Sequence, residues 1–291
     1  MQFQIGHMDT SEIDYDGLLL LSSSVASSRY IICPDDTAKL VSWQIAMADN
    51  TVRDVLFSET ESRDGVKNVG SKIFFNARSM PMAGFEPMAV ENLEFQKLPD
   101  GARELTFVPK DSEFPCHPRI IYKLSELYFR VEISLTNLSS TPMCWRPEIH
   151  FFVNLPWTSA TPLEKYVARS FAKKRLRVSD DLQVIGSAKS VEKISLGLLD
   201  DGAIGFGQLQ DSKIWVGTPN EEEGLSFIFG NKTQRSTMVM RKTKTAEKVE
   251  IAFLFDIPVD NGGSISNGDV QSYAIISPDI TDTFSAEILA Y

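Results

Sequence analysis

Cysteine and histidine are scarce in this sequence of 291 residues, with three of each. Cys33, Cys116 and Cys144 form no Cys-x-x-Cys pair, and neither they nor the dispersed histidines match the spacing of a zinc site. We therefore expect no bound metal. An odd, sparse set of cysteines is typical of reduced thiols in the cytosol, so we also expect a cytoplasmic protein.

Long apolar runs and basic arms are absent too. No stretch approaches the ~20 apolar residues of a membrane span, and the first residues lack the basic and apolar regions of a signal peptide. Lysine and arginine number 29 against 39 aspartate and glutamate, a net charge of −10. This acidic balance argues against nucleic acid as the main partner. The basic run Lys173-Lys174-Arg175, with Arg177, is offset by Asp180 and Asp181, and we interpret it as a solvated face.

Alternation of apolar and polar residues dominates what the sequence does contain. Residues 129–136 alternate without a break, as a half-buried antiparallel strand does, and residues 119–124 precede them as the other strand of a hairpin. Similar patterns predict strands at 17–22, 28–33, 38–45, 52–58, 105–108, 213–217, 225–229, 237–241, 249–257, 271–277 and 284–290. Many short strands between turn residues indicate an all-β sandwich. We find no linker, so residues 1–291 are expected to form one domain.

One helix is predicted, over residues 162–176. Thr161 and Glu164 are spaced as a capping box, and Pro162 suits the first helical position. Leu163, Tyr166 and Phe171 then share one face at helical spacing.

The segment Trp145–Trp157 carries the most chemical information. If it is a strand, Glu148, His150, Phe152 and Asn154 lie on one face, and the apolar residues between them face a core. A carboxylate, an imidazole, an aromatic ring and an amide suit a sugar, because rings cover C–H faces while amides and charges bind hydroxyls. A polar outer face of an edge strand would give the same pattern.

The order of these motifs resembles the galactose mutarotase-like superfamily, in particular its aldose 1-epimerase-like and hexose-6-phosphate mutarotase-like branches. The specific part is a hairpin of the form Y-x-L…V-x-I-x-L-x-N followed by P-x-x-H-x-F-x-x-L-P. Its matching residues here are Tyr122, Leu124, Val131, Ile133, Leu135, Asn137, His150, Phe152, Leu155 and Pro156. The resemblance implies a large antiparallel β-sandwich.

The resemblance also implies a reaction, the interconversion of the α and β anomers of an aldose or aldose phosphate. A base, usually glutamate, removes the proton from the anomeric hydroxyl while an acid, usually histidine, protonates the ring oxygen. The C1–O bond of the ring then breaks, rotation about C1–C2 follows, and the reverse steps close the ring. His150 matches the acid, and no cofactor is implied.

Other positions depart from the pattern. Ala83 stands where the family often has a sugar-contacting histidine, while Arg78 matches an arginine that binds sugar hydroxyls. The base glutamate has Asp256 as its nearest counterpart, a shorter side chain. Glu250 and Glu148 are the remaining candidates.

These departures leave two main interpretations open. The chain is either a mutarotase, or a carbohydrate-binding or regulatory module that has lost the catalytic pair. A polysaccharide-modifying or lyase-like sandwich is a third class, but we find no tyrosine–histidine or tyrosine–arginine arrangement for it. The expected partner in the first two is a small sugar or sugar phosphate, and the sequence indicates no oligomeric state.

Overall fold

A computed structural model of the protein describes residues 3–4, 19–23, 28–34, 36–46, 51–56, 70–79, 83–85, 90–99, 102–109, 115–125, 127–155, 161–170, 174–179, 184–189, 192–209, 213–220, 223–229, 236–243, 248–255 and 274–290. Antiparallel strands dominate these ranges, and their helical segments are two short 3-10 helices, η1 (Leu163–Lys165) and η2 (Leu196–Asp201). No helix among these residues is long and apolar enough to cross a membrane.

Two large sheets account for most of the strands. One has nine strands in the order β18 (Lys193–Ser195), β15 (Val167–Ser170), β20 (Lys213–Gly217), β21 (Gly224–Phe229), β25 (Thr281–Ala290), β12 (Tyr128–Asn137), β11 (Cys116–Leu124), β10 (Arg103–Pro109) and β9 (Val90–Lys97). The other has seven, in the order β17 (Val184–Lys189), β16 (Lys174–Val178), β19 (Ala203–Leu209), β22 (Ser236–Lys242), β23 (Val249–Phe255), β14 (Glu148–Val153) and β6 (Ser71–Phe74).

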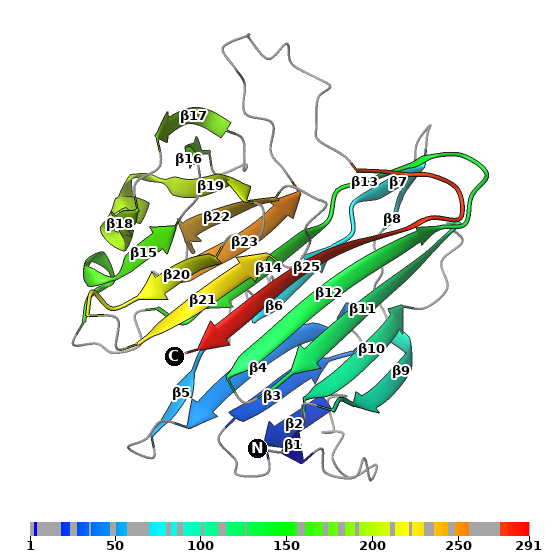
Figure 1. Cartoon of the computed structure of the whole chain (residues 1–291), viewed down its shortest axis with the longest axis horizontal. Helices are drawn as coiled ribbons and strands as arrows, with labels where there is room; N and C mark the ends of the chain where they lie inside the picture. The colour runs from blue at the N-terminus through cyan, green and yellow to red at the C-terminus, as the bar shows by residue number, and fades with distance from the viewer. Residues whose placement is uncertain are drawn as a thin grey trace, which may run out of the picture.

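Two smaller sheets complete the arrangement (Figure 1). Five strands near the N-terminus follow chain order: β1 (Phe3–Gln4), β2 (Leu19–Ser23), β3 (Ser28–Cys33), β4 (Lys39–Ala46) and β5 (Val52–Asp54). Four short strands pair as β24 (Ala274–Ile276), β13 (Met143–Trp145), β7 (Ala77–Ser79) and β8 (Ala83–Phe85).

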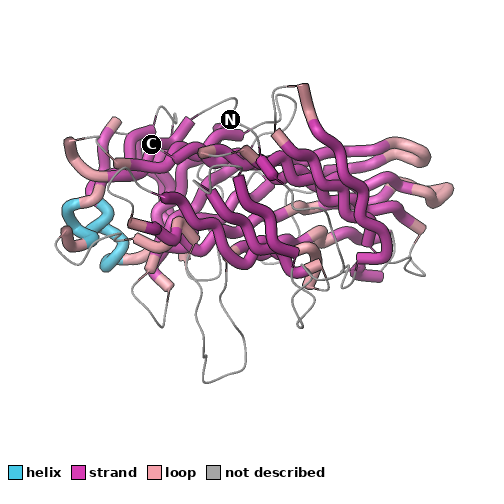
Figure 2. Tube along the Cα trace, turned by 90° about the horizontal axis from the view of Figure 1, so that it is seen from below, coloured by secondary structure: helices cyan, strands magenta, loops and turns pink. Residues whose placement is uncertain are grey.

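A chain of aromatic contacts joins the sheets through one core. The ring of Tyr30 stacks on that of Trp43 at 5.6 Å between centroids, and Trp43 meets Phe129 edge-on at 5.3 Å. Phe129 meets Phe151 at 5.4 Å, and Phe151 meets Phe253 at 5.8 Å, again edge to face. These geometries are the favourable ones for aromatic pairs. The contacts pass from the five-stranded sheet through the nine-stranded sheet to the seven-stranded sheet, and Figure 2 shows the strands in layers.

The sequence-based expectation of an all-β sandwich is therefore confirmed. The hairpin forms as predicted, with β11 paired to β12 from Cys116 opposite Asn137 to Leu124 opposite Phe129. Predicted strands 28–33 and 213–217 match β3 and β20, and the rest agree to within a few residues wherever the structure describes them. Residues 256–257 and 271–273 lie outside the described residues. The prediction missed β1, β6, β7, β8, β9, β13, β15, β16, β17, β18 and β19.

The predicted helix over 162–176 is wrong. Of the described residues in this range, 162–170 and 174–176, only those of η1 are helical, and no side chain caps η1. Tyr166 already has an extended backbone, with ψ of 151°. Residues Val167–Ser170 form β15, which is hydrogen-bonded to β18 on one side and β20 on the other. Hydrogen bonds to a neighbouring strand on each side of β15 outweigh the weak helical preference of its residues, and the β-branched Val167 suits a strand. Leu163 and Tyr166 are buried in the core, as their apolar character predicted.

Gly70 marks a point where two parts of the fold approach closely. Its φ of +58° is unfavourable for residues with a side chain, and a Cβ atom there would lie 1.9 Å from the carbonyl oxygen of Leu40. Its own carbonyl oxygen accepts the N–H of Phe152 at 2.8 Å. Only glycine fits between β4 and β14 at this position.

Gly70→Ala is expected to lower the free energy of unfolding by more than about 2 kcal/mol, because the strained φ and the backbone clash both act against the folded state. Gly186→Ala in β17 is the matched control, since an added Cβ there meets nothing within 4 Å. Urea denaturation of the two variants measures the difference. Equal stabilities would contradict this account of Gly70.

Candidate functional site

Strand β14 lies inside the seven-stranded sheet, between β6 and β23. His150 is opposite Lys72 of β6 and Ala252 of β23. Because side chains alternate along a strand, Ile149, Phe151 and Val153 enter the main core, and Glu148, His150 and Phe152 share the other face. The two-faced strand predicted from the sequence is present over Glu148–Val153.

The register between β14 and β23 adds a second carboxylate to that face. Glu250 is opposite Phe152 and hence diagonal to His150. The Nδ1 atom of His150 lies 2.8 Å from Oε1 of Glu250, and its Nε2 atom lies 3.2 Å from Oε2 of Glu148. The imidazole therefore bridges two carboxylates.

Each carboxylate also has an arginine. Arg241 of β22 donates to Glu250 through Nε at 2.5 Å and through Nη2 at 3.1 Å, a two-point ion pair. The Nε atom of Arg146 lies 3.6 Å from Oε1 of Glu148. Arg146, Glu148, His150, Glu250 and Arg241 thus form a continuous charged network, which we call the His150 cluster.

Burial and pairing act in opposite directions on the pKa values of the cluster. Burial alone would lower the pKa of His150, but the hydrogen bonds to Glu148 and Glu250 and their negative charges outweigh it, so this pKa is raised above 6.5. Burial likewise favours neutral Glu250, yet hydrogen bonds from His150 and Arg241 lower its pKa to about 2. Both shifts favour the charged forms, a protonated imidazole at His150 and an ionised carboxylate at Glu250.

Aromatic and basic side chains border the cluster. The ring of Phe74 meets the His150 ring edge-on at 5.1 Å. The Nζ atom of Lys72 lies 5.3 Å from the centre of the Phe152 ring, a cation–π contact. Burial lowers the pKa of Lys72. The positive charges of Lys39 and Arg241 lower it further, and the negative charges of Glu250 and Asp36 oppose this.

The same face becomes apolar away from the cluster. A row of paired positions runs from His150 through Ala252, Val239 and Gly205 to Leu176. A second apolar cluster occupies this part of the face, formed by Leu176, Val178, Ala203, Val239, Ala252 and Leu254. The His150 cluster therefore lies at the β14, β23 and β22 side of the sheet, away from the second apolar cluster.

Four of the residues predicted for the site come together: Glu148, His150, Phe152 and Glu250. Asn154 follows the end of β14, and its amide donates to the carbonyl oxygen of Asp54 at 3.1 Å. Arg78 lies in β7 opposite Cys144, in the four-stranded sheet. Asp256 lies outside the described residues.

Sequence reasoning missed Lys72, Phe74, Arg146 and Arg241. Arg241 ended a predicted strand, but its partner depends on the register of β22 against β23, which places it opposite Glu250. Arg146 was visible two residues before Glu148, and that spacing was a usable signal.

Among the described residues, no group of three or more His, Cys, Asp or Glu side chains could hold a metal ion, and Cys33, Cys116 and Cys144 are free thiols.

Comparison with solved structures shows that this arrangement of sheets is a galactose mutarotase-like fold. A galactose mutarotase related enzyme from Lactobacillus acidophilus superposes with a TM-score of 0.68 at 15% identity, over 91% of this chain and 95% of that chain. A galactose mutarotase-like protein from Lactobacillus casei gives 0.65 at 15% identity, over 94% and 100%. An aldose epimerase homologue from C. elegans gives 0.61 at 10% identity, over 91% and 96%.

No protein-family model and no curated protein sequence matches this chain. At these identities the solved structures establish the fold, which is the one that the sequence resemblance implied.

Glu250→Gln is expected to lower the pKa of His150, because it removes the negative charge that faces Nδ1. NMR titration of the imidazole carbon-bound protons measures this pKa in the wild type and the variant. Glu192→Gln, which makes the same charge change at an exposed residue, is the control. An unchanged His150 pKa in Glu250→Gln would show that the pair does not hold the cation.

Acid is expected to destabilise the protein partly through Glu250. The pKa of Glu250 is lowered from 4.5 to about 2 on folding, so its stabilising contribution is complete above pH 4.5 and is lost as the pH falls towards 2. Urea unfolding at a series of pH values should show a shallower loss of stability below pH 4.5 in Glu250→Gln than in the wild type. Parallel curves would contradict the lowered pKa.

Proposed function

We propose that this protein binds an aldose over the His150 cluster and interconverts its anomers by general acid–base ring opening. The observation that carries the proposal is the imidazole of His150, which two carboxylates orient on a sheet face that also has aromatic rings. The mutarotase-like fold supports the same reaction class, although a fold alone does not fix function.

His150 is proposed as the general acid, acting through Nε2. Its Nδ1 side faces Glu250, whose side chain is only 6% exposed, whereas Nε2 faces Glu148, which is 14% exposed and at the longer distance of 3.2 Å. A sugar ring oxygen that takes the place of the Glu148 carboxylate would receive the Nε2 proton. The raised pKa of His150 favours the protonated ring that a general acid needs.

Glu250 suits a positioning role better than the role of base. A carboxylate with a pKa of about 2 that is bound by Arg241 and His150 has little tendency to accept a proton. It fixes the tautomer and orientation of the imidazole, as the buried aspartate does in serine-protease triads. The base is then Asp256 or, once displaced from Nε2, Glu148.

Sugar binding is assigned to side chains that border His150. Phe152 and Phe74 offer ring surfaces for the C–H groups of a pyranose, and Arg78 remains a candidate for a hydroxyl. Lys72, Arg146 and Arg241 are basic side chains close to His150, beside Glu148 and Glu250, and could bind a phosphate group. An aldose phosphate is therefore included among the candidate substrates.

A carbohydrate-binding module without catalysis is the second candidate. It is favoured by one observation: both nitrogens of His150 and both oxygens of Glu250 already have partners. In that case the cluster would only recognise a sugar.

His150→Gln is expected to slow anomer exchange by roughly 10²–10⁴-fold, the usual contribution of a positioned acid. Exchange NMR on a panel of free hexoses and hexose 6-phosphates measures the rate. His117→Gln, the same change in β11 of the nine-stranded sheet, is the matched control.

Three results would overturn parts of the proposal. Exchange no faster than in buffer across the panel, together with saturable sugar binding, would establish the binding module instead. Binding and exchange that do not depend on His150 would refute the site. Full activity in Glu250→Gln would refute its positioning role.

A further inference from the structure

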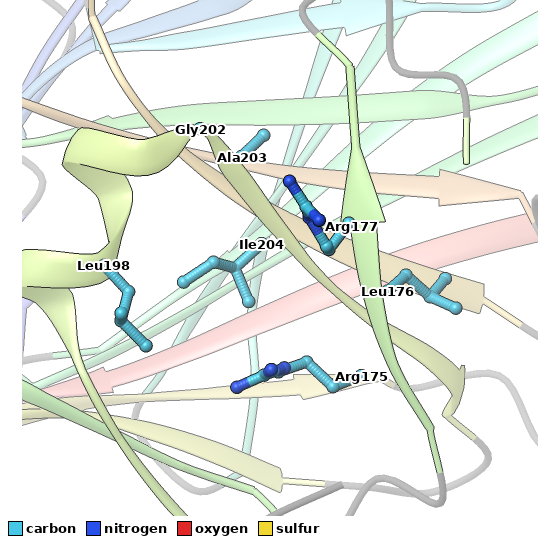
Figure 3. Close-up of a pocket in the computed structure, with 7 residues that line it drawn as sticks. All are labelled: Arg175, Leu176, Arg177, Leu198, Gly202, Ala203 and Ile204. Carbon is cyan, nitrogen blue, oxygen red and sulfur yellow. The ribbon is translucent and has the colours of Figure 1, made fainter. Parts of the chain in front are cut away.

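A concave surface lies at the other end of the seven-stranded sheet, beside η2. Its volume is about 520 Å³, and it is lined by Arg175 and Arg177 of β16, Ala203 and Ile204 of β19, and Leu198 of η2, among others (Figure 3). This volume is within the usual ~300–1,000 Å³ of small-molecule sites. None of the residues assigned to the His150 cluster contributes to it.

The two arginines project from the opposite side of the sheet to His150. They are paired with Phe206 and Ile204, which belong to the main core, whereas Leu176 between them belongs to the second apolar cluster. Figure 3 shows Arg175 and Leu176 extending to opposite sides of β16. Four strand spacings of ~4.8 Å separate β16 from β14, which is roughly 19 Å. The concave surface is therefore a separate place from the sugar site.

Neither guanidinium group is paired with a carboxylate of the part of the chain that the structure describes. Among the described residues, neither Arg175 nor Arg177 has a hydrogen bond or an ion pair. The carboxylate of Asp200 in η2 is bound to Lys242 of β22 instead. Arg175 is half-buried and Arg177 exposed. In a chain of net charge −10, two adjacent unpaired arginines are a local exception.

The other residues that line the concave surface are apolar side chains and one glycine. Ile204 is buried, and Leu198 is 42% exposed, which is unusual for a large apolar side chain beside a cavity. Gly202 leaves the rim clear, because a Cβ atom there would meet nothing within 4 Å. The concave surface thus combines two arginine side chains with apolar side chains, and its rim at Gly202 is open.

We propose that this concave surface binds a small phosphate monoester. Guanidinium groups bind phosphate oxygens through paired N–H groups, and two of them on one strand face can share a single dianion. Leu198 and Ile204 would contact the carbon part of the ligand. On this assignment Arg175 and Arg177, which the sequence analysis interpreted as part of a solvated face, form a phosphate site.

Isothermal titration calorimetry with inorganic phosphate and with phenyl phosphate tests the proposal. We expect phenyl phosphate to bind more tightly than inorganic phosphate, since it also covers Leu198. Arg175→Gln with Arg177→Gln should weaken binding of both probes by at least about tenfold, or ~1.4 kcal/mol. Thermal unfolding of this double variant checks that it is folded.

Two controls make the result specific. Arg29→Gln with Lys193→Gln removes two exposed charges elsewhere and should retain wild-type affinity. His150→Gln should retain it as well. The proposal would be overturned if the wild type bound neither probe at millimolar concentrations, or if the exposed-charge control lost as much affinity as the arginine variant. It would also be overturned if only His150→Gln lost affinity, because phosphate would then bind at the sugar site.

Discussion

Side chains are buried on both faces of the seven-stranded sheet, and the candidate site depends on this constraint. In β14 and β23, Phe151 and Phe253 continue the aromatic chain of the core while His150 and Glu250 occupy the other face. A shift of one residue in the register of either strand would exchange these sets. It would place charges in the core and rings in the site. The packing that stabilises the sandwich therefore also fixes the distance between imidazole and carboxylate.

Burying a charged network is costly unless every member has a partner. The His150 cluster meets this condition by alternating charge, from Arg146 through Glu148, His150 and Glu250 to Arg241. Replacing such a network by apolar residues of similar size is often neutral or stabilising. An apolar version exists a few strands away on the same face, in the second apolar cluster. This contrast within one sheet argues that the charges serve recognition or chemistry, and stability alone does not account for them.

The sequence predicted what depends on alternation within one strand, including the hairpin and the two faces of β14. It could not predict what depends on pairing between distant strands. Glu250 is 100 residues from His150, and only the register of β23 brings them together. The helix expected at 162–176 failed for the same reason, since β15 is held by β18 and β20. Arg175 and Arg177 looked like solvated charge because η2, which completes the concave surface, left no signal.

The fold and the acid–base chemistry place different demands on a sequence, and in this chain the first demand is met more fully than the second. A TM-score of 0.68 at 15% identity means that alternation and core volume sufficed to keep the sandwich. Acid–base chemistry depends on a few exact groups, and here Ala83 and Asp256 depart from the pattern that the resemblance implies. His150 matches the acid that the resemblance implies, and it is bound on both sides by carboxylates. The proposed activity therefore requires a sugar to displace Glu148 from Nε2, since Glu250 on Nδ1 is more deeply buried and also held by Arg241.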